Sequence, residues 1–336
     1  MAYSIRAIDD RNTWDEFILR YSPPSLFQSY LWGETQIRMD QPLWRIGLSD
    51  GGMLTGIASV AKIAAKRGVY LHIRHGPVFA GHNQSSWIAL ITHIRELARK
   101  NGASFIRISP QIAPTAENES FLRSLGFRPA AIHAMDAEVC RVLDIGQPIE
   151  TLLSGMRKTT RYEIRRAEKL GLVVRASTDR SDVDAFLRLY GDTAKRQRFV
   201  AHSGIREEFD VFGNDGRAII VSGLYEGKLL AGALILFHAD QAIYHHGASL
   251  RTKIPASYLV QWRAIQEAKK RGLKLYNFWG IAPENNPNHP WSGLSLFKKG
   301  FGGRTVSYLH AHDYVISSGY AVLRIIETAE KTFRGY

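Results

Sequence analysis

Two lysines stand beside a glycine-rich turn in the segment Phe297-Lys298-Lys299-Gly300-Phe301-Gly302-Gly303. An earlier segment, 268–281, has the pattern of a helix with a basic last turn, a stop at Gly272 and a strand rich in aromatic residues. Together the two segments supply basic and aromatic groups that suit a large anionic substrate. The alternative for Lys298 and Lys299 is that they only flank a turn.

A cationic stripe is predicted on a helix between residues 160 and 171. Thr160 and Glu163 have the spacing of a capping box, and Gly171 is a natural helix stop. Residues at i, i+4 and i+8 share one helix face, and here these are Arg161, Arg165 and Lys169. Such a face can hold a phosphate backbone, so we predict phosphate contacts at these three residues. The alternative is a solvated basic surface.

Charge and composition narrow the class of protein. The net charge of +13 favours partners that carry phosphate, among them nucleic acid, nucleotides and an anionic membrane surface. The single cysteine, Cys140, excludes a disulfide framework and a cysteine zinc site, and its apolar surroundings indicate a packed thiol. The sequence shows no signal peptide and no apolar run of the ~18 residues that a membrane span needs. We expect a soluble, cytoplasmic monomer.

Tyr244 and His246 alternate along a predicted strand at 243–249. Since alternate residues of a strand point to the same face, we expect these two side chains side by side. The alternative is a half-buried strand in which the polar groups of these two side chains form hydrogen bonds within the protein. His245-His246 and His310-x-His312 are not accompanied by a His-Glu-x-x-His pattern or by cysteines, so no metal site is predicted.

Three landmarks occur twice, in the same order and at nearly constant offset. An acid-glycine turn enters an apolar strand at Asp50 and again at Glu226. A basic helix end, a glycine and a strand follow at 98–108 and again at 268–278. A glycine-phenylalanine pair comes next, at Gly126 and at Gly300. The repetition predicts two homologous mixed α/β domains.

The order of elements within each copy is helix, antiparallel strands, helix, strand and short helix, which is the order of a Gcn5-related N-acetyltransferase (GNAT) fold. We predict such a domain at 1–146 and a second at 147–316 that carries the substrate cleft, with a last helix at about 317–336. Around the helix start at 250–256 there is no glycine-rich turn of the kind that cradles the pyrophosphate of coenzyme A. We therefore expect no coenzyme A and no other cofactor.

Four motifs, in order along the chain, give it a resemblance to a known family. They are Leu26-Phe27-Gln28-Ser29-Tyr30-Leu31-Trp32-Gly33-Glu34, the segment 156–168, Tyr276-Asn277-Phe278-Trp279-Gly280-Ile281 and the segment 297–303. This set resembles the Fem aminoacyltransferases (FemABX), which form the interpeptide bridges of peptidoglycan. The resemblance spans about 26–308.

The resemblance implies twin GNAT-like domains and transfer of an amino acid from aminoacyl-tRNA to a side-chain amine of the peptidoglycan stem peptide. No sustained heptad pattern is present, so the chain is similar to the FemX type, which has no coiled-coil arm. Members of that type use UDP-N-acetylmuramoyl-pentapeptide, and a lipid-linked precursor is the other candidate acceptor. The family architecture also implies that the last helix packs on the first domain.

The resemblance also implies roles for individual residues. Lys298 would stabilise the oxyanion or the tRNA terminus, and Phe297 would shape the acceptor channel. Arg38 and Arg206 would contact phosphate, with Gln36 competing for the first position and Arg196 and Arg198 for the second. The remaining substrate contacts would be Lys299, Tyr244 and His246. The phosphate backbone that Arg161, Arg165 and Lys169 contact would be that of tRNA. We expect a deep cleft in the second domain, near its interface with the first, lined by Arg206, Tyr244, His246 and Phe297.

The chain departs from the family in two strands. Many relatives have an aspartate where this chain has 107–110, and others have Tyr-Asp-Phe where it has Tyr276-Asn277-Phe278. Both changes remove a candidate general base. Two alternative functions are an N-acyltransferase of GNAT type that acts in cell-envelope or exopolysaccharide synthesis, and a non-catalytic RNA-binding module.

Overall fold

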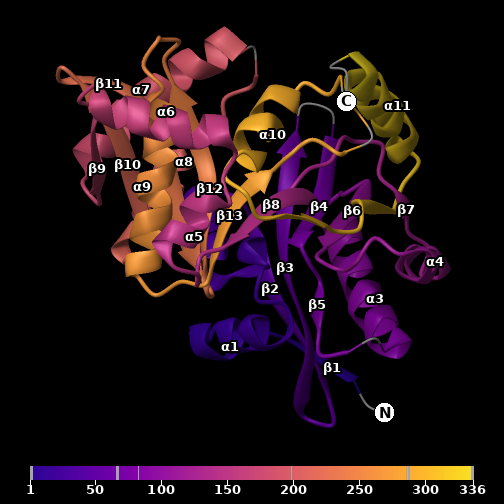
Figure 1. The fold of residues 1–336 in the computed structure, drawn as a ribbon. Helices are drawn as coiled ribbons and strands as arrows, with labels where there is room; N and C mark the ends of the chain where they lie inside the picture. Colours follow the sequence, from indigo (N-terminus) through magenta and orange to yellow (C-terminus); the bar gives the residue numbers. More distant parts are fainter. Residues whose placement is uncertain are drawn as a thin grey trace. The chain divides into compact units, whose positions relative to one another are not determined.

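The chain forms two compact units, each with its own sheet (Figure 1). The computed structural model describes residues 3–65, 68–81, 83–197, 199–284, 286 and 288–333. Unit 1 comprises Met1–Val139, Pro283–Pro290 and Ser307–Tyr336, and unit 2 comprises Cys140–Ala282 and Trp291–Val306. Within the described residues, no helix has the length and apolar character needed to cross a membrane.

Unit 1 has a mixed sheet with the strand order β1-β2-β3-β4-β6-β15-β7. The pair β4/β6 is parallel and the other pairs are antiparallel; β5 pairs with β3 off this path. Its strands are β1 (Tyr3–Ala7), β2 (Leu43–Asp50), β3 (Met53–Ala65), β4 (Gly68–His75), β5 (Val78–Phe79), β6 (Phe105–Pro110), β7 (Arg128–Pro129) and β15 (His312–Val315). Its helices are α1 (Arg11–Tyr21), α2 (Tyr30–Arg38), α3 (Gln84–Lys100), α4 (Ala116–Ser124) and α11 (Gly319–Phe333), with a 3-10 turn at Leu26–Gln28.

Helices cover both faces of this sheet because its strands carry apolar residues on both sides. Ile106 and Ile108 of β6 pack with the apolar side of α3. Phe105, which points to the opposite face, packs with Tyr320 and Leu323 of α11. Helix α1 packs beside β3 and β5 in a separate apolar cluster.

Unit 2 has a sheet with the strand order β14-β8-β13-β12-β11-β10-β9, in which the pair β12/β13 is parallel. Its strands are β8 (Val139–Asp144), β9 (Val173–Ser177), β10 (Ala218–Tyr225), β11 (Lys228–His238), β12 (Gln241–Ser249), β13 (Leu275–Gly280) and β14 (Arg304–Ser307). Its helices are α5 (Ile149–Ser154), α6 (Lys158–Lys169), α7 (Arg180–Gln197), α8 (Ile205–Asn214), α9 (Ala256–Lys270) and α10 (Ser292–Lys299).

Helices α6 and α9 cover one face of the second sheet, and α7 covers the other. Residues of α9 and α6 join Ala233 and Ile235 of β11 in an apolar cluster. A side chain at Gly232, which faces the other way, would collide with Phe186 of α7. The close approach of α7 to the sheet therefore requires glycine at this position.

The predicted repeat is present in the structure. Read from β9, unit 2 repeats the element order and the strand order of unit 1, with β1-β2-β3-β4-β6 corresponding to β9-β10-β11-β12-β13. Both predicted hairpin turns have positive φ at their two central residues, 51–52 and 226–227. The third landmark is not equivalent in conformation, because Gly126 has φ +89° whereas Gly300 has φ −61° and the left-handed residue after α10 is Gly302.

The sixth position of each sheet is filled by a strand from outside its own repeat. Strand β8 follows the first repeat in sequence but pairs with β13 of the second sheet. Strand β15 follows the second repeat but pairs with β6 of the first sheet. The structure thus divides the chain differently from the predicted boundary at 146/147, and β15 belongs to unit 1 rather than to the predicted domain 147–316.

A buried arginine joins the exchanged strand β15 to unit 1. Arg107 of β6 donates two hydrogen bonds to Asp313 of β15, at 2.7 and 2.8 Å, and two to Glu327 of α11, at 2.9 and 2.8 Å. The exposed fractions of the Arg107 and Asp313 side chains are 2% and 0%. Although burial alone would lower it, these two carboxylates raise the pKa of Arg107 above its usual value. The guanidinium is therefore a fixed charge that needs both partners.

Replacing Asp313 with asparagine should destabilise unit 1, because it leaves a buried guanidinium with half of its compensating charge. We expect Asp313→Asn to lower the free energy of unfolding by about 3 kcal/mol, near the lower end for a broken buried ion pair. Glu119→Gln is the matched control, since its partner Arg123 is exposed and the loss should stay below about 1 kcal/mol. Chemical denaturation measures both, and equal losses would contradict the prediction.

Candidate functional site

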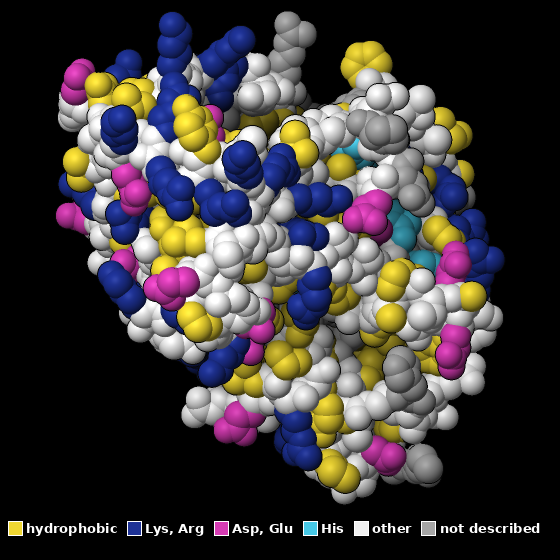
Figure 2. Space-filling view, viewed as in Figure 1, with side chains coloured by type: hydrophobic (Ala, Val, Ile, Leu, Met, Phe, Trp, Pro, Cys, Tyr) yellow, Lys and Arg dark blue, Asp and Glu magenta, His cyan; other side chains and the backbone are white. Residues whose placement is uncertain are grey.

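The predicted cationic stripe lies on α6, and Figure 2 shows Lys and Arg side chains gathered over the part of unit 2 where this helix lies. Arg165 and Lys169 are exposed. Arg161 is half-buried and donates hydrogen bonds to the carbonyl oxygens of Ser154 and Met156, so its guanidinium holds the turn between α5 and α6. Two of the three predicted phosphate contacts are therefore open to solvent, and the third has a structural role.

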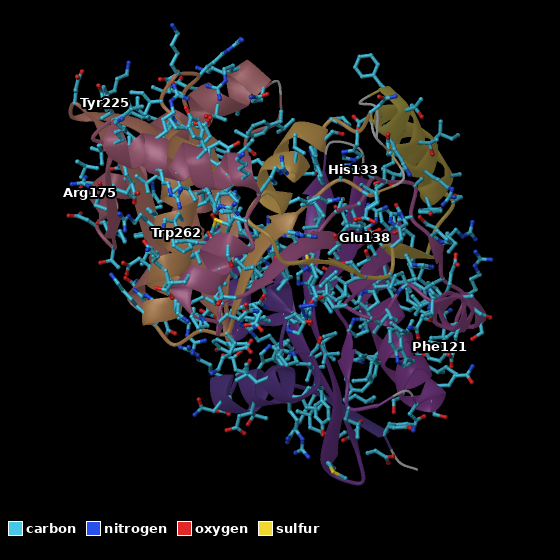
Figure 3. The ribbon with its side chains drawn as sticks, viewed as in Figure 1. Phe121, His133, Glu138, Arg175, Tyr225 and Trp262 are labelled. Atoms are coloured by element: carbon cyan, nitrogen blue, oxygen red, sulfur yellow. The ribbon has the colours of Figure 1, made fainter. Side chains whose placement is uncertain are left out.

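The predicted start of this helix is wrong, but its end is confirmed. The helix begins at Lys158 after the N-cap residue Arg157, so Thr160 lies inside the first turn and is buried instead of capping. Gly171 follows the helix with φ +81°, the left-handed conformation of a glycine stop. Arg175, labelled in Figure 3, lies on β9 and forms an ion pair with Asp182 of α7.

A β-bulge separates Tyr244 from His246, which corrects the expectation that both share one face. The register of β11 with β12 shifts between Leu234 and Ile235, whose partners are His246 and Tyr244, so that His245 is the extra residue. Tyr244 packs with the apolar cluster under α9, and burial raises its pKa to about 12. His246 lies on the opposite face, against Tyr190 of α7.

The two predicted phosphate-binding arginines are both exposed. Arg38 is the last residue of α2 in unit 1. Its competitor Gln36 is buried. Arg206 lies in the first turn of α8 in unit 2 and forms an ion pair with Asp184 of α7.

The two competitors of Arg206 have different outcomes. Arg196 donates to the carbonyl oxygen of Ser249, and Arg198 lies outside the described residues.

Lys298 is buried at the end of α10, with 5% of its surface exposed. Its Nζ donates to the carbonyl oxygen of Gly280 at 2.7 Å and lies 5.5 Å from the centre of the Tyr244 ring. Among the described residues, the Gly280 oxygen is its only hydrogen-bond acceptor. Burial lowers the pKa of Lys298 to about 7. Near neutral pH its charge is therefore sensitive to any anion that comes close.

The aromatic motif at 276–281 builds the site that receives Lys298. Tyr276 and Phe278 are fully buried in the core of unit 2. Asn277 accepts a hydrogen bond from the backbone N–H of Trp279, which has φ +66°. This left-handed residue precedes Gly280, the last residue of β13, whose carbonyl oxygen accepts the hydrogen bond from Lys298. Asn277, where the family resemblance led us to expect an aspartate, thus has a structural role here.

Phe297 belongs to an aromatic cluster, with its ring 5.0 Å from Tyr258 and 5.3 Å from Phe301. Lys299, the last residue of α10, is half-buried. A pocket of about 230 Å³ in unit 2 is lined by β8, α5 and the glycine-rich turn 301–304. Arg206, Tyr244, His246 and Phe297 do not line it, and the bulge in β12 turns the two strand residues apart. The prediction that these four residues line one cleft is therefore wrong, because Tyr244 and His246 lie on opposite faces of the sheet.

Asp136 is a buried carboxylate beside β6 that sequence reasoning did not identify. Asp136 accepts hydrogen bonds from Ser109 of β6 at 2.9 Å and from Arg74 of β4 at 2.7 Å, and lies 3.4 Å from His72. Although burial raises it, Arg74 and His72 hold the pKa of Asp136 well below its usual value. Such a carboxylate is a weak base. No local pattern identifies it, because it lies in an irregular segment.

Glu208 is the second carboxylate that the sequence did not identify. It lies in the first turn of α8 and is 4% exposed. His245 and His246 both contact it. An acidic residue in a first helical turn ordinarily interacts with the helix dipole at the surface, so its type and position gave no sign of a buried cluster.

Three comparisons relate the chain to known proteins. The model of the FemAB family matches residues 10–123, 126–212 and 218–328. The lipid II:glycine glycyltransferase of Staphylococcus epidermidis is 21% identical over 379 residues, which cover 90% of this chain and 91% of that protein. The UDP-N-acetylmuramoylpentapeptide-lysine N(6)-alanyltransferase of Weissella viridescens is 27% identical over 214 residues, 59% of this chain and 62% of that protein.

Solved structures share the fold. The crystal structure of FemX superposes with a TM-score of 0.81 at 19% identity and covers 96% of this chain and 100% of that one. A tandem GNAT protein from the clavulanic acid pathway gives a TM-score of 0.63 at 14% identity, over 94% of this chain and 99% of that one. The predicted tandem GNAT-like fold is confirmed.

The buried lysine should make stability depend on pH in a defined direction. An unfolded lysine has a pKa of about 10.4, so between pH 7 and pH 10 the unfolded chain binds more protons than the folded one. The stability of the wild type relative to Lys298→Met should therefore rise with pH across this window, by up to roughly 4 kcal/mol. Denaturation at several pH values measures it, with Lys299→Met as the neighbouring control. A difference that does not change with pH would show that Lys298 stays charged when buried.

Proposed function

The chain belongs to the FemAB family, and on that premise we propose that it transfers an amino acid from aminoacyl-tRNA to a side-chain amine in the stem peptide of a peptidoglycan precursor. The protein is an aminoacyltransferase of interpeptide bridge formation. The observation that carries the proposal is the family match, which extends across both units.

The acceptor we propose is a precursor that carries a diphosphate and a pentapeptide. The relatives named above act on lipid II in one case and on UDP-N-acetylmuramoyl-pentapeptide in the other. Exposed arginines suit the anionic part of either molecule, and Arg206 in unit 2 and Arg38 in unit 1 are the candidates. The exposed residues Arg165 and Lys169 of α6 are the candidates for the tRNA backbone.

The reaction needs alignment and charge stabilisation more than it needs a nucleophilic side chain. The acceptor amine attacks the ester carbonyl of the aminoacyl-tRNA, and a negative charge develops on the carbonyl oxygen. The amide bond forms, the ester bond breaks, and the proton lost by the amine balances the one gained by the ribose hydroxyl of the tRNA. We assign the stabilising charge to Lys298, whose protonated Nζ has N–H groups beyond the one that bonds to Gly280.

No step of this reaction requires coenzyme A, and we propose that the protein does not bind it. Helix α9 starts after Pro255, in a segment without the glycines that let a backbone approach a pyrophosphate. The acyl group then comes from the tRNA ester.

The direct test is incubation of the protein with charged tRNA and UDP-N-acetylmuramoyl-pentapeptide, or with lipid II in detergent. The proposal expects a mass increase of one amino-acid residue on one of the two acceptors. Transfer from acetyl-CoA instead would favour the N-acyltransferase alternative. Binding of tRNA without transfer to either acceptor would favour an RNA-binding module.

Lys298→Ala should lower the single-turnover rate by roughly 10²–10³, the usual loss for one oxyanion donor. Substrate binding should change little, because the interaction is strongest in the transition state. Lys298→Arg should restore only part of the rate, since a planar guanidinium does not fit the site of an ammonium. Lys299→Ala is the matched control. Equal, mild losses in the two alanine variants would remove Lys298 from the mechanism.

Charge reversal on the exposed side of α6 should weaken tRNA binding and reduce its dependence on salt. For Arg165→Glu with Lys169→Glu, each lost phosphate contact should lower the slope of log affinity against log salt by ~0.7–0.9. Arg123→Glu on α4, also exposed, is the control. Titrations at several salt concentrations measure the slope, and a slope like that of the wild type would mean that α6 is only a solvated surface.

A further inference from the structure

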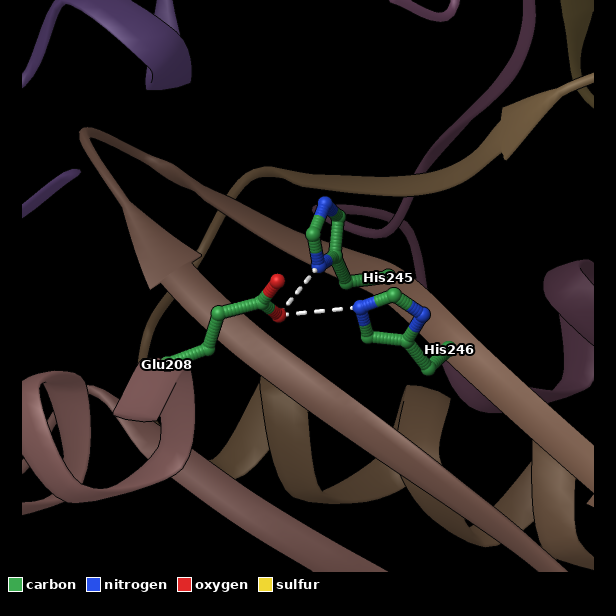
Figure 4. A group of neighbouring side chains, drawn as sticks. All are labelled: Glu208, His245 and His246. Carbon is green, nitrogen blue, oxygen red and sulfur yellow. Dashed lines mark hydrogen bonds and ion pairs between the residues drawn. The ribbon is translucent and has the colours of Figure 1, made fainter. Parts of the chain in front are cut away.

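Three potential metal ligands meet between α8 and β12 in unit 2 (Figure 4). The Oε2 atom of Glu208 lies 3.0 Å from Nδ1 of His245 and 2.9 Å from Nε2 of His246. The ligand atoms of the three residues all lie within 4.8 Å of one another. Two imidazoles and one carboxylate are a donor set that binds zinc and related divalent metals.

The bulge in β12 makes this cluster possible. In a regular strand His245 and His246 would point to opposite faces, and only one of them could reach Glu208. Because His245 is the extra residue of the bulge, both rings lie on the side of α8, with centroids 4.3 Å apart. Bulges of this kind re-aim side chains next to functional sites.

Burial and charge both favour a cation at this position. The exposed fractions of the three side chains are 5–6%. A buried carboxylate needs a compensating positive charge, and a divalent metal bound by neutral imidazoles would supply it. The cost is that both hydrogen bonds to Glu208 would have to be replaced by metal–ligand bonds.

Two of the three donor pairs need only a small change in geometry. Metal–ligand bonds of about 2.0 Å at tetrahedral angles place donor atoms roughly 3.3 Å apart. The two donor pairs measured here are 3.0 and 2.9 Å apart, so each would separate by a few tenths of an ångström. Helix α8 and strand β12 supply the ligands, and regular elements hold such atoms more precisely than loops do.

A fourth donor lies close by. The ring of His202, in the segment between α7 and α8, has its centroid 5.4 Å from that of His246. A zinc ion with three protein ligands keeps a fourth position for water or for another side chain. His202 would have to move inward to fill it, since it is exposed and does not belong to the group whose ligand atoms lie within 4.8 Å of one another.

We propose that Glu208, His245 and His246 form a binding site for a divalent metal of the zinc type, with His202 or water at the fourth position. The site joins α8, which carries Arg206, to β12, which carries Tyr244. The proposal does not depend on the proposed function, since the metal would bind whatever reaction the protein catalyses.

The test uses the full chain after removal of metals with a chelator. Zn²⁺ binding is measured by calorimetry, and Co²⁺ is added as a probe because tetrahedral and octahedral cobalt have different visible spectra. We expect one Zn²⁺ per chain and a tetrahedral Co²⁺ spectrum that Zn²⁺ abolishes. Glu208→Gln and His246→Gln should each weaken Zn²⁺ binding at least 10-fold.

The matched control is His310→Gln in unit 1. His310 contacts Glu138 at 2.8 Å, which makes a histidine–carboxylate pair without a second imidazole on the same carboxylate. This variant should keep the metal affinity of the wild type. The proposal is overturned if the wild type binds no Zn²⁺ at micromolar concentration, which would leave a metal-free hydrogen-bonded cluster. It is also overturned if folded Glu208→Gln and His246→Gln bind as tightly as the wild type.

Discussion

The ion pair between Arg107 and Asp313 is the interaction on which the first unit depends. A guanidinium in the middle of a sheet is tolerated only if carboxylates surround it, and both of its partners come from segments more than 200 residues later in the chain. Once β15 is held in this way, β7 can pair with its far edge and α11 can cover Phe105. The buried charge of Arg107 thus favours β15 as the strand that completes the sheet. Apolar packing alone would discriminate less between β15 and other strands.

The second unit has its own constraint, which is the extra residue in β12. It turns Tyr244 toward the core that surrounds Lys298 and turns His245 and His246 toward Glu208. One backbone irregularity therefore separates the residues of a single strand into two chemical environments. The surroundings of Lys298 are apolar and disfavour its charged form. The surroundings of His245 and His246 contain the buried carboxylate of Glu208.

Features with a local cause could be predicted from the sequence. Hairpin turns with glycine, helix ends with glycine and the order of elements follow from backbone preferences over a few residues, and they were enough to identify the repeat. The exchange of β8 and β15 could not be predicted. Each of these strands pairs with a strand far away in the sequence, and neither strand carries a local pattern that identifies its partner. The bulge at His245 was missed since alternation assumes a regular strand. Asp136 and Glu208 were missed because their partners come from other elements.

The exchange of β15 has a consequence for how the chain folds while it is being synthesised. When the ribosome has produced the first repeat, β6 has no partner on one edge, and Arg107 has neither Asp313 nor Glu327 beside it. An open strand edge of this kind can pair with another chain. The first repeat therefore becomes complete only after residues 312–327 have left the ribosome, and until then the edge of β6 stays open.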